Sequence, residues 1–214
     1  MRKILPLLLI GLTSCAIYRA KPLENLPQDS FKEVTSDFFV GYKKLTPEEE
    51  KRYLGKNFVS TCFDAIQLTF ENSTENWYQF IEESVSLPTV DALTVYKKAR
   101  FSPTGRFLGY SLVLPIAGTG LMGAFTHEFY SIGPLVFIGF VFYGTIFGVI
   151  DAECAVYAND RMKNDYMQKS PDCLTIHPKT TVRTLLFVEK KDFQEDFSFT
   201  LREEPSGELL QVNL

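Results

Sequence analysis

The chain has 214 residues, of which 45% are hydrophobic, and a formal net charge of −4 at pH 7. A chain of this length and composition can bury the core of one or two domains. The negative net charge argues against a nucleic-acid partner, because binding to phosphates requires clustered Lys and Arg side chains. It likewise disfavours an acidic substrate.

Residues 1–14 have the parts of an export signal peptide. Arg2 and Lys3 give a positive start, and residues 4–12 form an apolar stretch that is too short to span a bilayer. Small residues follow this stretch. We therefore expect residues 1–14 to be removed during export.

The end of this leader, Leu12-Thr13-Ser14-Cys15, matches the lipobox pattern, and the chain here resembles a bacterial lipoprotein precursor. The resemblance covers residues 1–15 only, and no family is recognised for the rest of the chain. It implies that Cys15 is acylated and becomes the new N-terminus, so that a covalent lipid on Cys15 is the only attached group expected. It also implies a place in the bacterial cell envelope.

Residues 15–30 are predicted to be a tether, because Pro22 and Pro27 interrupt them and no helical or strand period is visible. The folded part should begin near Phe31, with a first strand over residues 34–42. A short helix is expected after it, since Thr46 is a good N-cap, Pro47 and Glu49 suit a capping box, and Gly55 can end the helix.

Residues 65–71 alternate between apolar and polar side chains, which predicts a half-buried strand. Asn72 begins both a turn and a glycosylation sequon, and the turn is the favoured interpretation. Residues 77–87 can return as a second strand. The basic residues that follow, Lys97, Lys98, Arg100 and Arg106, are expected to mark a water–membrane boundary with contacts to lipid head groups.

Residues 107–150 contain a single formally charged side chain, Glu128. Residues 107–125 and 129–150 are each near the ~20 residues that a helix needs to cross a bilayer. We predict a two-helix transmembrane hairpin with its turn at residues 126–128. Both flanks would then face the same compartment.

The hairpin carries glycines at Gly118, Gly120 and Gly123, the spacing of a dinucleotide-binding loop. That loop requires a soluble helix and an acidic residue about twenty positions later, and the region here is apolar. Together with Gly144 and Gly148, these glycines favour close packing between the two membrane helices, or between copies of the chain.

After the hairpin, residues 151–169 are predicted to continue the second helix into water. Strands are expected at residues 174–176, 182–188 and 197–202, and the last of these forms a hairpin with residues 210–214 through Pro205, Ser206 and Gly207. The predicted fold is therefore mainly β, an antiparallel sandwich with immunoglobulin-like topology. One discontinuous domain, residues 31–106 with 151–214, is interrupted by the hairpin at residues 107–150.

Few residues suggest chemistry. His127 and Glu128 lack the second His of a zinc-protease motif, so no metal site is predicted. No catalytic residues can be assigned, because no serine lies in a nucleophile elbow. Cys62 and Cys173, both next to predicted strands, are a candidate disulfide in an oxidising compartment.

Two features of the sequence predict opposite sides of the membrane for the domain. Basic residues on both flanks of the hairpin would place the domain in the cytoplasm by the positive-inside rule. Acylation of Cys15 requires export, so we favour a periplasmic domain. The choice between inner and outer membrane stays open.

Two functions are predicted, neither of them enzymatic. In the first, an envelope lipoprotein holds a noncatalytic β-sandwich at the membrane, where it binds envelope proteins or stabilises an assembly. In the alternative, glycine-rich hairpins associate into an oligomeric component of a transport or secretion complex. The expected partners are membrane lipids, envelope proteins and further copies of the chain.

Overall fold

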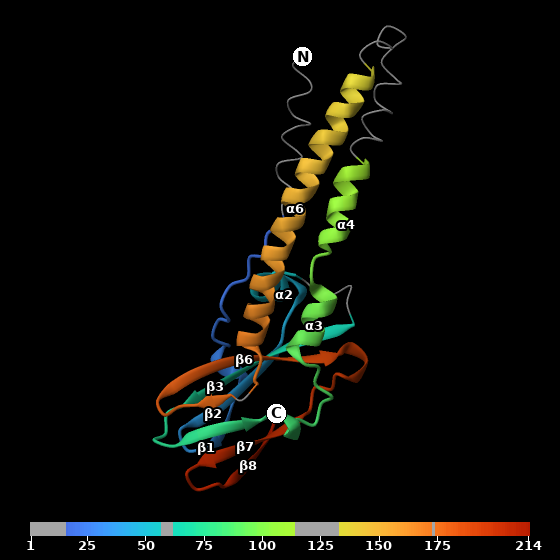
Figure 1. Ribbon diagram of the computed structural model, residues 1–214. Coiled ribbons are helices and arrows are strands. Elements are labelled where there is room, and N and C mark those ends of the chain that lie inside the picture. Colours follow the sequence, from blue (N-terminus) through green and yellow to red (C-terminus); the bar gives the residue numbers. More distant parts are fainter. Residues whose placement is uncertain (1–15, 57–61, 114–132, 173) are drawn as a thin grey trace. The chain divides into compact units, whose positions relative to one another are not determined.

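The computed structural model describes residues 16–56, 62–113, 133–172 and 174–214 (Figure 1). The chain divides into two compact units. Unit 1 comprises Met1–Tyr18 and Arg100–Arg161, and unit 2 comprises Arg19–Ala99 and Met162–Leu214. Unit 2 therefore combines segments from both sides of the helical region, with its boundaries at Ala99 and Met162 rather than at residues 106 and 151.

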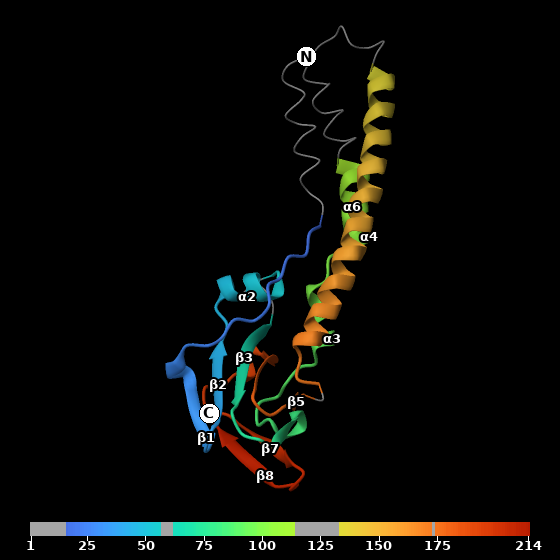
Figure 2. The ribbon, with the colours of Figure 1, turned by 90° about the vertical axis from the view of Figure 1, so that its left-hand side faces the viewer.

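Unit 2 contains two four-stranded antiparallel sheets (Figure 2). The first has the order β1-β2-β3-β6, with β1 at Phe31–Thr35, β2 at Phe38–Lys44, β3 at Phe63–Asn72 and β6 at Thr180–Glu189. The second has the order β5-β4-β7-β8, with β4 at Trp77–Ile81, β5 at Thr175–Ile176, β7 at Ser198–Glu204 and β8 at Leu209–Asn213. This arrangement confirms the prediction of an antiparallel, sandwich-like fold.

The core of unit 2 combines side chains from both sheets. The ring of Phe199 on β7 lies 5.2 Å from that of Phe80 on β4 and 6.0 Å from that of Phe70 on β3, measured between ring centroids. All three side chains are buried. Because burial of a large aromatic side chain contributes a large share of core stability, this cluster is a main contact between the sheets.

The strand order differs from the predicted immunoglobulin-like topology, which puts the third strand in the sheet opposite the first two. Here β3 pairs with β2 over seven residues. The difference begins at Asp37, whose positive φ of 67° allows a tight turn. The predicted single strand at residues 34–42 is therefore a hairpin, and β1, β2 and β3 lie side by side.

The short helix α2, Pro47–Leu54, has the predicted ends. Thr46 accepts a hydrogen bond from the backbone N–H of Glu49, whose side chain accepts one in return, and Gly55 closes the helix in the left-handed conformation. The C-terminal hairpin between β7 and β8 is also as predicted. Shorter elements complete unit 2: η1 at Gln28–Ser30, η2 at Glu82–Ser84, α3 at Ala92–Ala99 and η5 at Lys190–Asp192.

Strand β3 is buried on both faces, although its alternating sequence predicted a half-buried strand. Gln67 and Thr69, the polar residues of the outer face, are both buried. The amide of Gln67 donates to the carbonyl of Glu24 at 2.7 Å. The segment predicted as a tether thus covers this face in part. Its Glu24 carbonyl accepts a hydrogen bond from Gln67, which allows this polar side chain to be buried.

That segment is bound to unit 2 at further points. The backbone N–H of Lys21 donates to the carbonyl of Arg52 at 2.8 Å. The buried ammonium of Lys169, on the last turn of α6, donates to the carbonyl of Lys21 at 2.9 Å and to Asp165 at 2.7 Å. Residues 19–27 have no regular secondary structure, as expected, yet they are held by several hydrogen bonds.

The helical region consists of α4, Pro103–Leu108, the π-helical turn η3, Gly109–Val113, and the long helix α6, Gly133–Lys169. The prediction that the second apolar helix continues past residue 150 is confirmed. The described residues do not show a two-helix hairpin, because its predicted turn at residues 126–128 and most of its first arm lie outside them. Within those residues, α6 is the one helix that is long and apolar enough to cross a membrane.

The Phe70–Phe80–Phe199 cluster gives a test of the core. Phe199→Ala should lower the free energy of unfolding by about 3–5 kcal/mol, because it leaves a cavity among the three rings. Unfolding of the full-length protein in detergent can be followed through Trp77, the only tryptophan of the chain. Thr200→Ala, on the opposite face of the same strand, should change the free energy of unfolding by less than about 1 kcal/mol. Equal effects of the two substitutions would contradict this assignment of the core.

Candidate membrane-anchoring site

A buried carboxylate on α6 organises the described part of unit 1. Asp151 is 3% exposed and follows directly after the apolar stretch of the helix. Its oxygens accept hydrogen bonds from Nη1 of Arg106 at 3.0 and 3.1 Å, and Oδ1 also accepts one from the backbone N–H of Ala16 at 3.1 Å. A buried charge is tolerated when it is paired in this way.

Helix α4 presents Arg106 to this carboxylate. Ser102 caps the helix, since its Oγ accepts from the backbone N–H of Gly105 at 3.1 Å, and Pro103 occupies the first turn. The connection before α4 is also fixed to α6. The side chain of Asn159 donates to the carbonyl of Phe101 at 2.9 Å and accepts from its N–H at 2.8 Å. Both hydrogen-bonding groups of one backbone residue are thus satisfied.

Small side chains allow the N-terminal segment to approach α6 closely. Ala16 is buried against Ala155 and Ala158, and Tyr18 and Phe101 pack at the edge of this cluster. Ala16 immediately follows Cys15, the predicted lipidation site, which lies outside the described residues. The residue next to the predicted lipid is therefore held against the helix at the end of its apolar stretch.

One predicted packing glycine has a defined contact. A Cβ atom on Gly148 would lie 3.1 Å from the carbonyl oxygen of Phe107 and 3.1 Å from Oγ of Ser111, which is tighter than an ordinary contact. A larger residue would push these neighbouring atoms away by a few tenths of an ångström, so the glycine favours this close approach of the two helical segments. Gly144 is also buried. The predicted contacts of Gly118, Gly120 and Gly123 lie outside the described residues.

Oγ of Ser111 is buried and has no hydrogen-bond partner among the described residues. It lies 3.1 Å from the position that a Cβ atom on Gly148 would take, so the contact with α6 depends on the missing side chain of this glycine. This contact lies in the π-helical turn η3, where the regular helical hydrogen-bond pattern changes.

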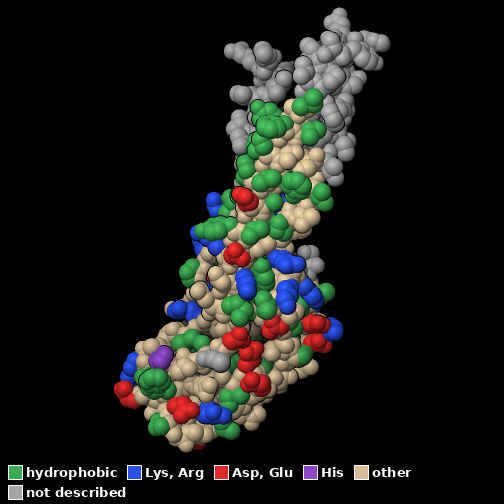
Figure 3. All heavy atoms as spheres, in the orientation of Figure 1, with side chains coloured by type: hydrophobic (Ala, Val, Ile, Leu, Met, Phe, Trp, Pro, Cys, Tyr) green, Lys and Arg blue, Asp and Glu red, His purple; other side chains and the backbone are tan. Residues whose placement is uncertain are grey.

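Large apolar side chains crowd the surface of α6 before Asp151 (Figure 3). Their exposed fractions reach 63% at Phe142 and 62% at Ile138. The exposed residues are Ile138, Val141, Phe142, Tyr143, Ile146, Val149 and Ile150. Soluble proteins rarely expose so many large apolar side chains side by side. This surface of α6 therefore indicates contact with lipid or with another apolar surface.

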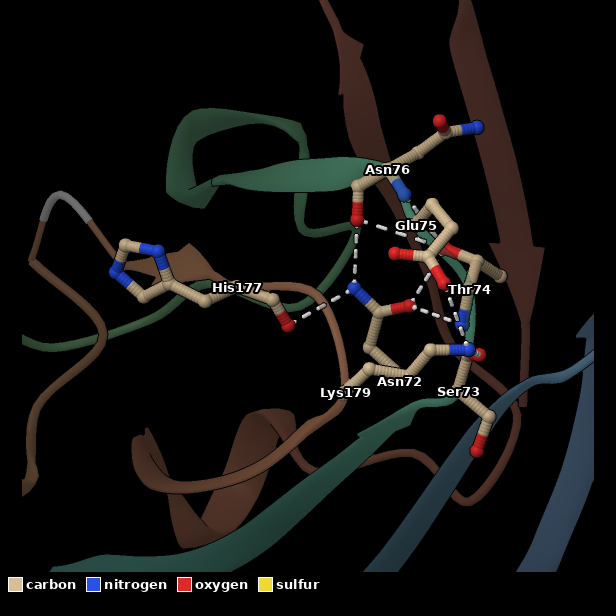
Figure 4. A network of polar contacts seen from close by, with 7 residues as sticks. All are labelled: Asn72, Ser73, Thr74, Glu75, Asn76, His177 and Lys179. Carbon is tan, nitrogen blue, oxygen red and sulfur yellow. Dashed lines mark hydrogen bonds and ion pairs between the residues drawn. The ribbon is translucent and has the colours of Figure 1, made fainter.

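The sequon residue Asn72 is committed to a turn (Figure 4). Its Nδ2 donates to the carbonyls of Asn76 at 2.8 Å and His177 at 3.0 Å, and its Oδ1 accepts from the N–H and the hydroxyl of Thr74. Because Asn72 is 2% exposed and its amide nitrogen is fully used, the turn interpretation is confirmed and attachment of a glycan would break the network.

The remaining predicted sites are not tested by the geometry. Cys62 is exposed just before β3, and Cys173 lies outside the described residues, so a disulfide between them stays a prediction. His127 and Glu128 also lie outside them. In the part of the chain that the structure describes, no three His, Cys, Asp or Glu side chains gather in the way a metal ion would require.

Comparisons of this chain with protein-family models, curated proteins and solved structures found no match.

Sequence reasoning did not identify Asp151, Arg106 and Asn159 as a group. Arg106 was expected only as part of a basic boundary, and Asp151 only as the first residue of the part of the helix predicted to continue into water. A usable signal was present: a carboxylate immediately after an apolar helix needs a cationic partner if it is buried. The sequence alone does not show that Asp151 is buried.

The carboxylate of Asp151 can be tested through the N-terminal segment. Asp151→Ala removes the acceptor for the Ala16 N–H and leaves Arg106 without its ion pair, so the Ala16 amide should exchange with deuterium at least about tenfold faster. Asp151→Asn keeps an acceptor oxygen and should give an intermediate rate. Asp160→Ala, an exposed carboxylate on the same helix, is the matched control. Unchanged exchange in Asp151→Ala would contradict this role.

Unit 2 also contains a group of neighbouring carboxylates around Glu82. Burial and the neighbouring Asp172 carboxylate raise the pKa of Glu82 to about 7, and Glu83 and Asp91 add to the shift. Glu82 follows β4, whereas Asp172 precedes β5. The two carboxyl groups interact through a hydrogen bond, which is favourable only while one of them holds a proton.

This cluster predicts a pH dependence. Because the pKa of Glu82 is raised in the folded state, the folded protein holds this proton more tightly than the unfolded chain does. Proton binding at Glu82 therefore adds to the free energy of unfolding. This contribution is complete below the ordinary pKa of glutamate and is lost as the pH rises through about 7. Glu82→Gln keeps a neutral side chain and should raise the melting temperature relative to wild type by about 1–3 °C more at pH 8 than at pH 5. Glu83→Gln should show a smaller change. A difference that is constant across this range would exclude the raised pKa.

Proposed function

We propose that the protein is a bacterial envelope lipoprotein that holds a noncatalytic β-sandwich at a membrane surface, where the sandwich binds another envelope protein or stabilises an assembly. The observation that carries this proposal is the belt of seven exposed, large apolar side chains on α6. One helix able to cross a membrane is compatible with anchoring.

The apolar belt of α6 and a lipid on Cys15 can be compared by the free energy that each would contribute to membrane binding. Transfer of one large, fully exposed apolar side chain from water to an apolar medium contributes roughly 1.5–3 kcal/mol. Because the side chains of the belt are about half exposed, the belt would contribute on the order of 5–10 kcal/mol in a bilayer. A single acyl chain alone gives marginal, reversible binding. The helix is therefore the main anchor, and a lipid on Cys15 would add to it.

The contacts of Ala16 support attachment of a lipid at Cys15. The hydrogen bond to Asp151 and the packing on Ala155 and Ala158 hold the chain beside α6 from its first described residue. An acyl chain on the preceding residue would then start next to the apolar surface of the same helix. Lipid and helix would enter one membrane together.

The sandwich offers a surface for a partner. Trp77 on β4 is 48% exposed and contacts His177, with ring centroids 4.6 Å apart. Leu209 on β8 is 61% exposed, and both side chains lie on the outward face of the second sheet. Exposed tryptophan is enriched among residues that dominate protein interfaces, so this face is where we expect a partner protein.

The alternative, an oligomer formed through glycine-rich helices, has less support. Gly148 is used within the chain, where it contacts Phe107 and Ser111. A surface already occupied in this way is not open to a second copy. The remaining glycines of the predicted hairpin lie outside the described residues.

Two variants separate the two anchors. Cys15→Ser should abolish incorporation of labelled palmitate, because it removes the acyl acceptor, while the protein stays in the membrane fraction after alkaline extraction, because α6 remains. Cys62→Ser, a change at an exposed cysteine of unit 2, should keep both the label and the membrane association. Release of Cys15→Ser into the soluble fraction would contradict the role of α6, and equal labelling of wild type and Cys15→Ser would contradict lipidation.

A further inference from the structure

A groove of about 390 Å³ runs along α6 in unit 1, on the side of the helix away from Ala16. Phe107 of α4 forms one wall, and the rest of the lining comes from a single stripe of α6 residues. The lining residues are Phe107, Val149, Ala152, Glu153, Val156, Tyr157 and Asp160. We call it the interface groove, because it begins on the apolar part of α6 and ends on its charged part.

The interface groove changes in polarity along its length. Phe107, Val149 and Ala152 line the apolar beginning of the groove, and carboxylates follow along the stripe, first Glu153 and then Asp160 at the far end. With a rise of 1.5 Å per residue, the stripe from Val149 to Asp160 is about 16 Å long. A ligand that fits this gradient has an apolar tail and a polar head.

The polar end carries charges of both signs. Glu153 and Asp160 are exposed and form no ion pair among the described residues. The guanidinium carbon of Arg161 lies 4.6 Å from the ring centroid of Tyr157, which holds the cation beside the groove. Two carboxylates and one guanidinium within three turns of helix match a head group that has one cationic and one anionic part.

We propose that the interface groove binds one phospholipid with a zwitterionic, primary-amine head group, of the phosphatidylethanolamine type. The ammonium donates to the carboxylates of Glu153 and Asp160, the phosphate contacts Arg161, and the beginning of an acyl chain lies against Phe107 and Val149. This inference rests on the proposed membrane anchoring, since it places the groove at the boundary between lipid and water.

The charges select among lipid classes. A phosphatidylglycerol head lacks a cation and would bring a negative charge next to two carboxylates. A phosphatidylcholine head has a cation without N–H donors, so it makes no hydrogen bonds to Glu153 or Asp160. The groove should therefore prefer ethanolamine to choline, and choline to glycerol.

The test uses the full-length protein in detergent and short-chain, water-soluble lipids with identical tails, so that binding is measured whether or not the protein is anchored. Native mass spectrometry across a lipid titration should give the order ethanolamine, choline, glycerol. The double substitution Glu153→Gln/Asp160→Asn should weaken binding of the ethanolamine lipid about tenfold and leave the glycerol lipid unchanged or slightly tighter.

Two further variants complete the design. Glu204→Gln/Glu208→Gln makes the same change of net charge at exposed positions of unit 2 and should leave lipid binding unchanged. Ala152→Phe fills the apolar end and should weaken binding of all three lipids. Equal binding of the ethanolamine and glycerol lipids, or unchanged binding by the groove double variant, would overturn the proposal. Membrane fractionation of the same proteins tests anchoring separately, so a failure of the groove and a failure of the proposed function give different results.

Discussion

The pairing of β3 with β6 is the constraint on which the rest of the structure depends. Ten residue pairs join Phe63–Asn72, which precedes the helical region, to Thr180–Glu189, which follows it. The second sheet repeats the pattern, because β4 from the first segment lies between β5 and β7 from the second. Neither segment has a complete sheet alone. If the helical region enters a membrane, the chain must return to the side from which it entered, so that these strands can meet.

The contacts of α6 explain how one helix can serve both units. Its last turns belong to unit 2, where Tyr166 is buried, donates to the carbonyl of Leu54 at 3.1 Å and stacks on Phe187. Its earlier turns belong to unit 1, where Asp151 binds Arg106 and the Ala16 backbone. In each unit, taken by itself, the buried polar groups of the helix have specific partners, which favours one packing of its side chains there.

Sequence reasoning succeeded where a local pattern has a local cause. The capping residues Thr46, Glu49 and Gly55 define α2 from neighbouring residues alone, and the turn at residues 205–207 defines the last hairpin. It failed where distant residues decide. The alternation in β3 cannot show that Gln67 is covered through the carbonyl of Glu24, and strand order depends on a turn at Asp37 that the apolar pattern of residues 34–42 conceals. The Asp151 cluster was missed for the same reason, since Ala16 lies 135 residues from its partner.

The most direct test of the central claim, that both flanks form one domain around a helical insertion, is to replace residues 100–161 by a flexible Gly/Ser linker and to follow unfolding through Trp77. Loop-closure entropy changes slowly with length, so this replacement should cost little. The linked protein should be soluble and unfold in one cooperative transition, whereas residues 19–99 alone should not fold, because β3 and β4 would lack β6, β5 and β7. A stable, monomeric fragment of residues 19–99 would contradict the claim and show that two separate domains flank the helices.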